Sequence, residues 1–353
     1  MKYRAFADTG VFVSELCLGA MTFGGSGQIW ETIGGMSQAE VDAMVGRALD
    51  AGINFVDTAN VYAAGESEVM TGKALGKRRH EVVLATKVRG RVGIGHNDVG
   101  LSRLHIMKSV EDSLRRLGTD YIDLYQIHRP DPVTDIEDTL RALDDLVRQG
   151  KVRYIGCSNL WAWQVMKALA VSDGLGLHRF RSTQSYYSLV GREIERDLIP
   201  LVEDQAMGLL AWSPLAGGFL SGKFTRDETG EGRRKTFDFP PVDREKGYDV
   251  VDAMKKIADD RGATVAQIAL AWVLANDAVT SVIIGARNQK QLEDNLGAVE
   301  IELTDEDLDT LDAASSIAPA YPGWMDALGS DRFPGETRRY DRGSEGSSGG
   351  GDA

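Results

Sequence analysis

Cysteine is scarce in this sequence: 353 residues contain only Cys17 and Cys157. Each lies in an apolar, strand-like run, so two small buried side chains are a better interpretation than a disulfide. Such sparing use of cysteine is typical of a reducing compartment. The chain also lacks a basic-then-apolar start, and no apolar run is long enough to span a membrane. We therefore expect a cytoplasmic protein without a membrane segment.

Positive charge is also in short supply. Lysine and arginine number 40 against 53 aspartate and glutamate residues, which gives a net charge of -13. This excess of negative charge argues against nucleic acid and against an anionic membrane surface as partners. Any phosphate-bearing ligand would therefore need a local basic pocket. The hydrophobic fraction of 42% and the charged fraction of 26% are typical of a globular protein.

Strand and helix patterns alternate along most of the chain. Strand-like runs at 3–6 and 11–16 flank Asp8-Thr9-Gly10, which is a turn signal. Further strands are expected at 17–21, 53–57, 82–87, 121–127, 152–157, 181–186, 207–212 and 280–284, and helices at 38–51, 66–75, 103–117, 136–149, 162–171, 195–205 and 264–275. This alternation indicates a parallel sheet with crossover helices. Eight strands after the first pair favour closure into a (β/α)₈ barrel, which periodicity alone does not establish.

Three loop segments interrupt the alternation. A glycine-rich segment from Gly24 to about Ser37 is either a flexible connector or a rim loop that brings Trp30 over a pocket. Residues 89–102 form a second glycine-rich loop. Residues 224–248 form a long polar insertion that carries Arg233-Arg234-Lys235.

The chain ends in a tail that begins near Ala318. Its last part, from Gly343 to Gly351, is rich in glycine and serine and has no apolar side chain. Such a composition cannot bury a core and is typical of disorder. We therefore expect one barrel domain over residues 1–340 and a disordered tail over residues 341–353.

Four polar side chains follow three successive strand ends. Asp57 closes a short apolar run, Tyr62 follows on the next turn, and Lys87 and His128 end the next two strand-like runs. In parallel α/β folds, ligands bind at this carboxyl edge of the sheet. Each residue alone has an ordinary explanation, such as a turn cap, a rim aromatic, a solvated lysine or a structural histidine. The four together predict a catalytic site.

Asp, Tyr, Lys and His in this chain order resemble the catalytic tetrad of the aldo-keto reductase family. The resemblance extends to about residue 303 and is closest to long-loop members, such as bacterial carbonyl reductases and potassium-channel β-subunits. It implies a (β/α)₈ TIM barrel with an N-terminal β-hairpin capping the bottom. It also implies that Tyr62 is the general acid and that Lys87 lowers its pKa. Asp57 would orient Lys87, and His128 would position the carbonyl oxygen.

The hydride for such a reaction must come from a cofactor, because no side chain donates one. No G-x-G-x-x-G motif follows a strand, so a Rossmann site is not expected. The resemblance instead places the cofactor against residues of the later strand ends: Ser158, Asn159, Gln184, Trp212, Ser213, Pro214, Leu215, Gly217, Lys223, Gly285, Arg287, Gln291 and Asn295. Considered alone, Ser158 is better interpreted as a helix N-cap than as a cofactor-binding residue.

Each part of this set would hold a different part of the cofactor. By resemblance, Ser158, Asn159 and Gln184 hold the nicotinamide carboxamide, and Trp212 stacks on the nicotinamide ring. The glycine-rich run from Gly217 would approach the pyrophosphate, with Lys223 adding charge. Gly285, Arg287, Gln291 and Asn295 would bind the adenosine half. Arg287 stands at the position that would bind a 2′-phosphate, which favours NADPH. The spacing of Gln291 and Asn295 alone would equally fit a solvated polar face of a helix.

The sequence therefore predicts an NADPH-dependent oxidoreductase that interconverts small-molecule aldehydes or ketones with alcohols. The alternative is a cofactor-binding regulatory subunit with slow turnover. A barrel hydrolase is poorly supported, because no cluster of metal ligands and no strand-end carboxylate pair stands out. The substrate, the direction of reaction and the oligomeric state do not follow from the sequence. Candidates for the pocket rim are Trp30, Phe23, Trp161 and His96.

Overall fold

The computed structural model describes residues 1–25, 28–224, 226, 234 and 236–326 of the chain. The chain divides into two compact units, residues 1–316 and residues 317–353. The described part of the second unit contains one short helix, α12 (Gly323–Asp326). The tail over 341–353, expected to be disordered, lies outside the described residues, as do Arg233 and Lys235 of the polar insertion.

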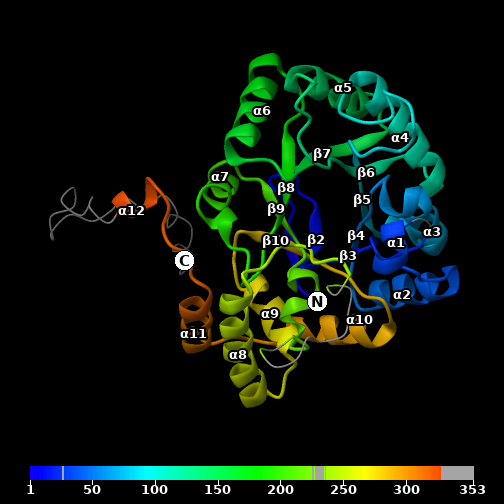
Figure 1. Ribbon diagram of the computed structural model, residues 1–353. Helices are drawn as coiled ribbons and strands as arrows, with labels where there is room; N and C mark the ends of the chain where they lie inside the picture. Colours follow the sequence, from blue (N-terminus) through cyan, green and yellow to red (C-terminus); the bar gives the residue numbers. More distant parts are fainter. Residues whose placement is uncertain (26–27, 225, 227–233, 235, 327–353) are drawn as a thin grey trace, which may run out of the picture. The chain divides into compact units, whose positions relative to one another are not determined.

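Eight parallel strands form a closed barrel, which confirms the predicted TIM-barrel fold. The strands are β3 (Leu16–Gly19), β4 (Phe55–Asp57), β5 (Val83–Val88), β6 (Ile122–Ile127), β7 (Val152–Ser158), β8 (Phe180–Tyr186), β9 (Gly208–Trp212) and β10 (Val279–Ile284). They pair in chain order, and β10 pairs with β3 to close the barrel (Figure 1). Their residues are almost wholly buried, as expected for parallel strands covered on both faces.

A two-stranded antiparallel hairpin precedes the barrel, as predicted. It consists of β1 (Tyr3–Ala5) and β2 (Phe12–Ser14). Phe6 and Val13 of this hairpin region are buried in one cluster with inward-facing barrel residues such as Phe55. The hairpin therefore plugs the amino-terminal end of the barrel, opposite the strand ends that carry the predicted site.

The helices surround the strands (Figure 1). Those predicted from the sequence are α2 (Gln38–Asp50), α3 (Glu66–Leu75), α4 (Arg103–Leu117), α5 (Ile136–Arg148), α6 (Ala162–Leu175), α7 (Leu198–Asp204) and α9 (Val265–Leu274). Capping residues determine where several of these helices begin. Ser37 and Glu40 form a reciprocal capping box at α2, and Asp135 caps α5. Apolar residues at helical spacing then bury one face of each helix against the barrel.

Further helices lie where the predicted secondary structure had none. They are α1 (Gln28–Ile33), α8 (Arg244–Arg261) and α11 (Asp305–Ser315). The helix α10 (Gln289–Leu296) carries Gln291 and Asn295, where the family resemblance implies a helix. The expectation of a loop throughout Gly24–Ser37 is therefore wrong, because α1 occupies its middle. The start of α8 was likewise read as part of the polar insertion. Its signal is Asp243, whose side chain accepts a hydrogen bond from the backbone of Lys246 as an N-cap.

Among the helices that the structure describes, none combines the length and the apolar character needed to cross a membrane.

Candidate active site

A cavity of about 1060 Å³ opens at the carboxyl ends of the barrel strands. Its lining includes Asp57, Tyr62, His128, Ser158, Asn159, Gln184, Trp212, Ser213, Pro214, Leu215, Gly217, Lys223, Gly285, Arg287, Gln291 and Asn295. The structure thus brings together, around one cavity, all the predicted site residues except Lys87. Lys87 is fully buried on β5 and contacts the site from beneath.

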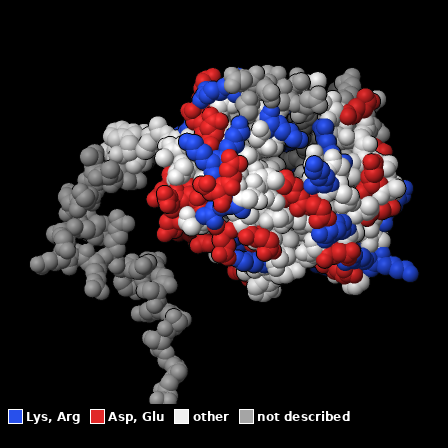
Figure 2. Space-filling view, turned by 90° about the horizontal axis from the view of Figure 1, so that it is seen from below, with Lys and Arg blue, Asp and Glu red and all other residues white. Residues whose placement is uncertain are grey.

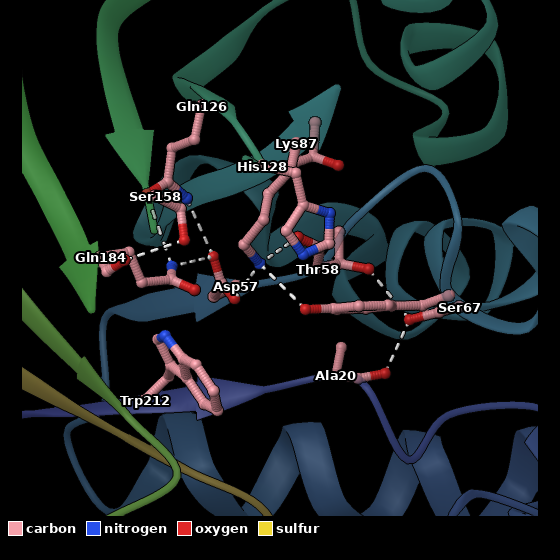
Figure 3. A network of polar contacts seen from close by, with 12 residues as sticks. Ala20, Asp57, Thr58, Ser67, Lys87, Gln126, His128, Ser158, Gln184 and Trp212 are labelled. Carbon is pink, nitrogen blue, oxygen red and sulfur yellow. Dashed lines mark hydrogen bonds and ion pairs between the residues drawn. The ribbon is translucent and has the colours of Figure 1, made fainter. Parts of the chain in front are cut away.

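Lys87 is the centre of the polar network at the base of this cavity. Its ammonium lies 2.5 Å from Asp57 Oδ2 and 2.8 Å from the carbonyl oxygen of Thr58. It also donates to the Tyr62 hydroxyl over 3.3 Å. Figure 3 shows Lys87 reaching between Asp57 and Thr58. A buried lysine needs such partners, since an isolated buried charge is very costly.

The Asp57 carboxylate is held from both sides. One oxygen accepts from Lys87, and the other accepts from Gln126 Nε2 at 3.1 Å and from Gln184 Nε2 at 3.0 Å. Gln184 Nε2 also approaches Gln126 Oε1 at 3.4 Å. These donors come from β5, β6 and β8, so three strands fix the position of one carboxylate (Figure 3).

A strained turn presents Tyr62 to the cavity. Tyr62 begins a short 3₁₀ segment after β4, in which Ala63 and Ala64 have φ angles of 47° and 54°. Residues with side chains rarely adopt this left-handed conformation, and such strain is concentrated at functional sites. The Tyr62 ring packs at 5.7 Å from the His128 ring on one side and at 5.7 Å from the Trp30 ring on another.

The electrostatics of the pair formed by Lys87 and Tyr62 differ in part from the sequence argument. Burial would lower the pKa of Lys87, but Asp57 and Tyr62 more than offset it, so that pKa lies above its ordinary value. Burial raises the pKa of the Tyr62 phenol, and the Lys87 charge opposes this shift without reversing it. The phenol therefore remains protonated, and Lys87 limits the cost of ionising it.

His128 is a neutral imidazole in this environment. Burial, together with the positive charges of Lys87 and Arg129, lowers the pKa of His128 well below its ordinary value. A neutral ring keeps one N–H that can donate to an oxygen, without adding a charge beside Lys87.

The polar residues at the ends of β7 and β8 are bound to one another. Ser158 Oγ donates to the carbonyl oxygen of Gln184 at 2.8 Å. Asn159 Nδ2 donates to the carbonyl oxygen of His128 at 3.0 Å, and Asn159 Oδ1 accepts from Trp212 Nε1 at 3.0 Å. Ser158 therefore does not cap the helix that follows, although an N-cap is the simplest interpretation of Ser158 from the sequence. It links two strand ends at the wall of the cavity.

Trp212, at the end of β9, already has aromatic neighbours. The Phe239 ring stacks on it with a centroid distance of 5.9 Å and an interplanar angle of 12°, and Tyr186 lies at 5.2 Å with a tilt of 36°. The face of the indole can thus stack against another flat ring. A nicotinamide ring would have to share this stack with Phe239 or replace one of its members.

The glycine-rich turn after β9 is a tight left-handed structure. Gly217 and Gly218 have φ angles of 66° and 94°, and a Cβ on Gly217 would lie 2.4 Å from the carbonyl oxygen of Phe239. The amides of these two glycines donate to Ser213 Oγ and to the carbonyl oxygen of Leu215. Both amides already donate hydrogen bonds within the turn. A phosphate at this position would therefore be bound by the charged side chain of Lys223.

Arg287 follows β10 at the far side of the cavity. Its guanidinium donates to the carbonyl oxygen of Thr32 in α1 at 2.5 Å, and its backbone amide donates to Gln291 Oε1 at 2.9 Å. Asn295 Nδ2 donates to the carbonyl oxygen of Gly285 at 3.2 Å. Arg287 is exposed and makes no ion pair within the described part of the chain, so its charge remains available to an anion.

These features fit a nicotinamide dinucleotide. A flat aromatic surface lies beside amide and hydroxyl groups at one end of the cavity. Two cations, Lys223 and Arg287, line the side formed by the β9 and β10 loops. The donor set does not resemble a metal site, since no group of three or more metal-ligating side chains occurs among the described residues.

One residue of this network, Gln126, is not predicted from the sequence, and three of the four predicted rim residues lie away from the cavity. Gln126 lies on β6, two residues before His128, and is fully buried. Its only signal in the sequence is a polar side chain near the end of a mostly apolar strand. Among the rim candidates, Trp30 lines the cavity. Phe23 is buried in the core, while Trp161 and His96 are exposed and do not line the cavity.

The sequence matches the Aldo/keto reductase family over residues 15–316. It is 38% identical over 317 residues to the uncharacterized oxidoreductase YrpG of Bacillus subtilis, which covers 87% of this chain and 93% of that protein. It is 34% identical to the versiconal hemiacetal acetate reductase of Aspergillus parasiticus, covering 92% and 99% of the two chains. It is 36% identical to a probable voltage-gated potassium channel subunit beta of Arabidopsis thaliana, covering 91% and 99%. The family predicted from the tetrad is thus confirmed, and the chain belongs to the Aldo/keto reductase family.

Proposed function

We propose that the protein reduces an aldehyde or ketone to the alcohol, reversibly, with NADPH as the hydride donor. The observation that carries this proposal is the buried Lys87 ammonium, which is bonded to both Asp57 and the Tyr62 hydroxyl at the base of the cavity. A phenol next to a fixed ammonium is a proton donor whose anion is stabilised at the moment it forms.

The geometry supports a separate role for each residue of the tetrad. NADPH, when bound, supplies the hydride that adds to the carbonyl carbon. The Tyr62 hydroxyl gives its proton to the carbonyl oxygen, and the phenolate that forms lies beside Lys87. Asp57 holds Lys87 in place, and the neutral His128 ring donates an N–H toward the same oxygen. The Tyr62 and His128 rings, 5.7 Å apart, can therefore hold one oxygen between them.

The proposed cofactor site uses the opposite wall of the cavity. Ser158, Asn159 and Gln184 would hold the carboxamide, and Trp212 would stack on the nicotinamide ring. Lys223 would face the pyrophosphate, and Arg287 the 2′-phosphate. Support for these roles comes from the lining of the cavity and from the two cations on its β9 and β10 side. We also retain the cytoplasmic location, for which the two free, buried cysteines give support.

The names of some relatives support a reductase function, and the names of others support an alternative function. Several similar proteins are named as oxidoreductases, a reductase or an aryl-alcohol dehydrogenase. Others, from rice and Arabidopsis thaliana, are named as probable voltage-gated potassium channel β subunits. The second candidate function is therefore a cofactor-binding regulatory subunit that turns over slowly.

Steady-state kinetics separate the two functions. Oxidation of NADPH and of NADH should be followed with a panel of aromatic aldehydes, ketones and sugar aldehydes. The proposal predicts multiple turnovers with at least one carbonyl substrate and a higher kcat/KM with NADPH. Tight NADPH binding without multiple turnovers on any member of the panel would favour the regulatory subunit.

A further inference from the structure

Besides Arg287, two arginines that line the cavity form no ion pair among the described residues. Arg91 lies in the loop after β5, and Arg129 directly follows the strand end that carries His128. Arg91 Nη1 donates to the carbonyl oxygens of Gly93 and Gly95 at 3.0 and 2.8 Å, which fixes the side chain but leaves its charge uncompensated. Among the described residues, neither arginine forms an ion pair, whereas others nearby do, such as Arg103 with Asp145.

These arginines lie across the barrel mouth from the proposed cofactor cations. In the closed order, β5 is four strands away from β9, and β6 is four strands away from β10. In an eight-stranded barrel such strands face each other. The strand order therefore separates Arg91 and Arg129 from Lys223 and Arg287, to which the phosphates of the cofactor are assigned. The cavity offers positive charge at two opposite sides, which calls for two separate anionic groups.

Arg129 is close enough to the proposed reaction centre for its charge to act there. It is one of the groups that lower the pKa of His128, together with burial, Lys87 and Arg89. Arg89 does not line the cavity; its φ is 123°, and its buried Nε has no hydrogen-bond partner among the described residues. Asp131 is near enough to feel the Arg89 charge, but its oxygens bind Leu101, Val133 and Thr134.

Uncompensated positive charge at this point is unexpected for a protein of net charge -13. Arg91 and Arg129 are exposed, so water solvates their charges, but they leave the cavity positive at this side and attract an anion. Figure 2 shows lysine and arginine side chains on both sides of a hollow in the surface. An anion bound there would form charge-assisted hydrogen bonds with guanidinium groups.

Several other residues that line the cavity are aromatic. Trp30 packs against Tyr62 at 5.7 Å, and Phe237 packs against Phe239 at 5.5 Å. All four line the cavity. Flat rings of this kind accept another flat ring by stacking.

We infer that the substrate is an aromatic aldehyde or ketone that carries a carboxylate, with the carbonyl at Tyr62 and the carboxylate at Arg91 and Arg129. This inference rests on the proposed function, because it places the carbonyl by the Tyr62 hydroxyl. It adds a substrate class and two residues that select for it.

A matched pair of substrates tests the inference directly. 4-Formylbenzoate and its methyl ester share the aldehyde, the ring and nearly the same shape, and differ in charge. The ester group withdraws electrons more strongly, so intrinsic reactivity favours the ester. The wild-type protein should nevertheless show a kcat/KM for the carboxylate that is about ten- to a hundredfold higher, as expected for charge-assisted hydrogen bonds.

Variants then assign the preference to the two arginines. Arg91→Met and Arg129→Met should each lower the carboxylate-to-ester ratio, and the double variant should bring it close to one. Arg129→Lys should retain part of the preference, because a positive charge remains. Arg103→Met is the control, since Arg103 is exposed and already paired with Asp145. Its ratio should match that of the wild type.

The outcomes distinguish this inference from the proposed function. Equal kcat/KM values for acid and ester in the wild type, or a preference unchanged in the double variant, would overturn the substrate class while leaving carbonyl reduction intact. If no aldehyde is reduced, calorimetry of both compounds with the NADP⁺-loaded protein still decides. Tighter binding of the carboxylate that is lost in the double variant would support the anion site, and equal affinities would refute it.

Discussion

The Lys87 ammonium lies 3.3 Å from the Tyr62 hydroxyl but 2.5 Å from an oxygen of Asp57. The lysine therefore interacts strongly with the carboxylate and makes a longer, weaker hydrogen bond to the phenol. Such an arrangement leaves room for the interaction with Tyr62 to strengthen when the phenol loses its proton. It predicts that the three residues affect the pH dependence of the reaction in different ways.

Replacing Lys87 by Met should raise the pKa of Tyr62 still further. The Lys87 charge lowers this pKa, against the larger effect of burial. Carbonyl reduction needs the protonated phenol, so its rate falls as the pH rises through the Tyr62 pKa. In Lys87→Met this fall should move to higher pH, and alcohol oxidation, which needs the phenolate, should slow at every pH below it. Rate profiles in both directions check the shift, and profiles that match the wild type would contradict the role of Lys87.

Replacing Asp57 by Asn should shift the same profile in the opposite direction. If Asp57 did no more than orient Lys87, its loss would have a milder effect of the same sign, because Lys87 would be held less well. In the structure, however, the negative charge of Asp57 raises the pKa of Tyr62. As long as Lys87 stays protonated, removing this charge should lower the pKa of Tyr62 and move the fall in reduction rate to lower pH. A shift to higher pH in Asp57→Asn would instead show that the loss of order in Lys87 dominates.

Gln126 should act as a positioning residue for Asp57. Its side chain is fully buried and donates to Asp57 Oδ1 at 3.1 Å. A buried hydrogen bond to a charged group stabilises by about 1.5–3 kcal/mol, so Gln126→Leu should lower the free energy of unfolding by about this amount. It should also lower kcat more than it raises the KM for NADPH. The exposed Gln149→Leu is a matched control, and equal stabilities and rates in the two variants would remove Gln126 from the site.

Arg287 should supply much of the preference for NADPH. Its guanidinium also bonds to the carbonyl oxygen of Thr32, so part of any effect of its removal will come from α1. NADH provides the internal control, because it lacks the 2′-phosphate and depends on α1 equally. Arg287→Ala should weaken NADPH binding by about ten- to a hundredfold and leave NADH binding nearly unchanged. Equal losses for both cofactors would assign Arg287 to structure alone.

The barrel and the tetrad could be predicted because their signals are local. Short apolar runs, each followed by a helix pattern, mark the strands. Asp57, Lys87 and His128 each stand at the end of such a run, and Tyr62 stands on the turn after the first of them. The register that brings them together is set by the closed sheet. Sequence spacing alone could not show that Lys87 lies beneath the cavity rather than in its lining.

The parts that escaped prediction depend on contacts between distant segments. Gln126 becomes a donor to Asp57 only when β4 and β6 flank β5, an arrangement that no local pattern encodes. The stack of Phe239 on Trp212 joins an insertion to a strand end in the same way. The pKa of Tyr62 also depends on its burial, which outweighs the nearby cation, and burial follows from the assembled fold.

The central claim is that Tyr62 donates the proton in a hydride-transfer reaction, and Tyr62→Phe tests it most directly. The measurement is a single-turnover reduction of an aromatic aldehyde by enzyme preloaded with NADPH, together with the affinity of the variant for NADPH. General acid catalysis contributes about 10²–10⁴-fold, so we predict that the rate falls by at least this factor while NADPH affinity stays the same. A near-normal rate in Tyr62→Phe would contradict the account, because the proton would then come from another group.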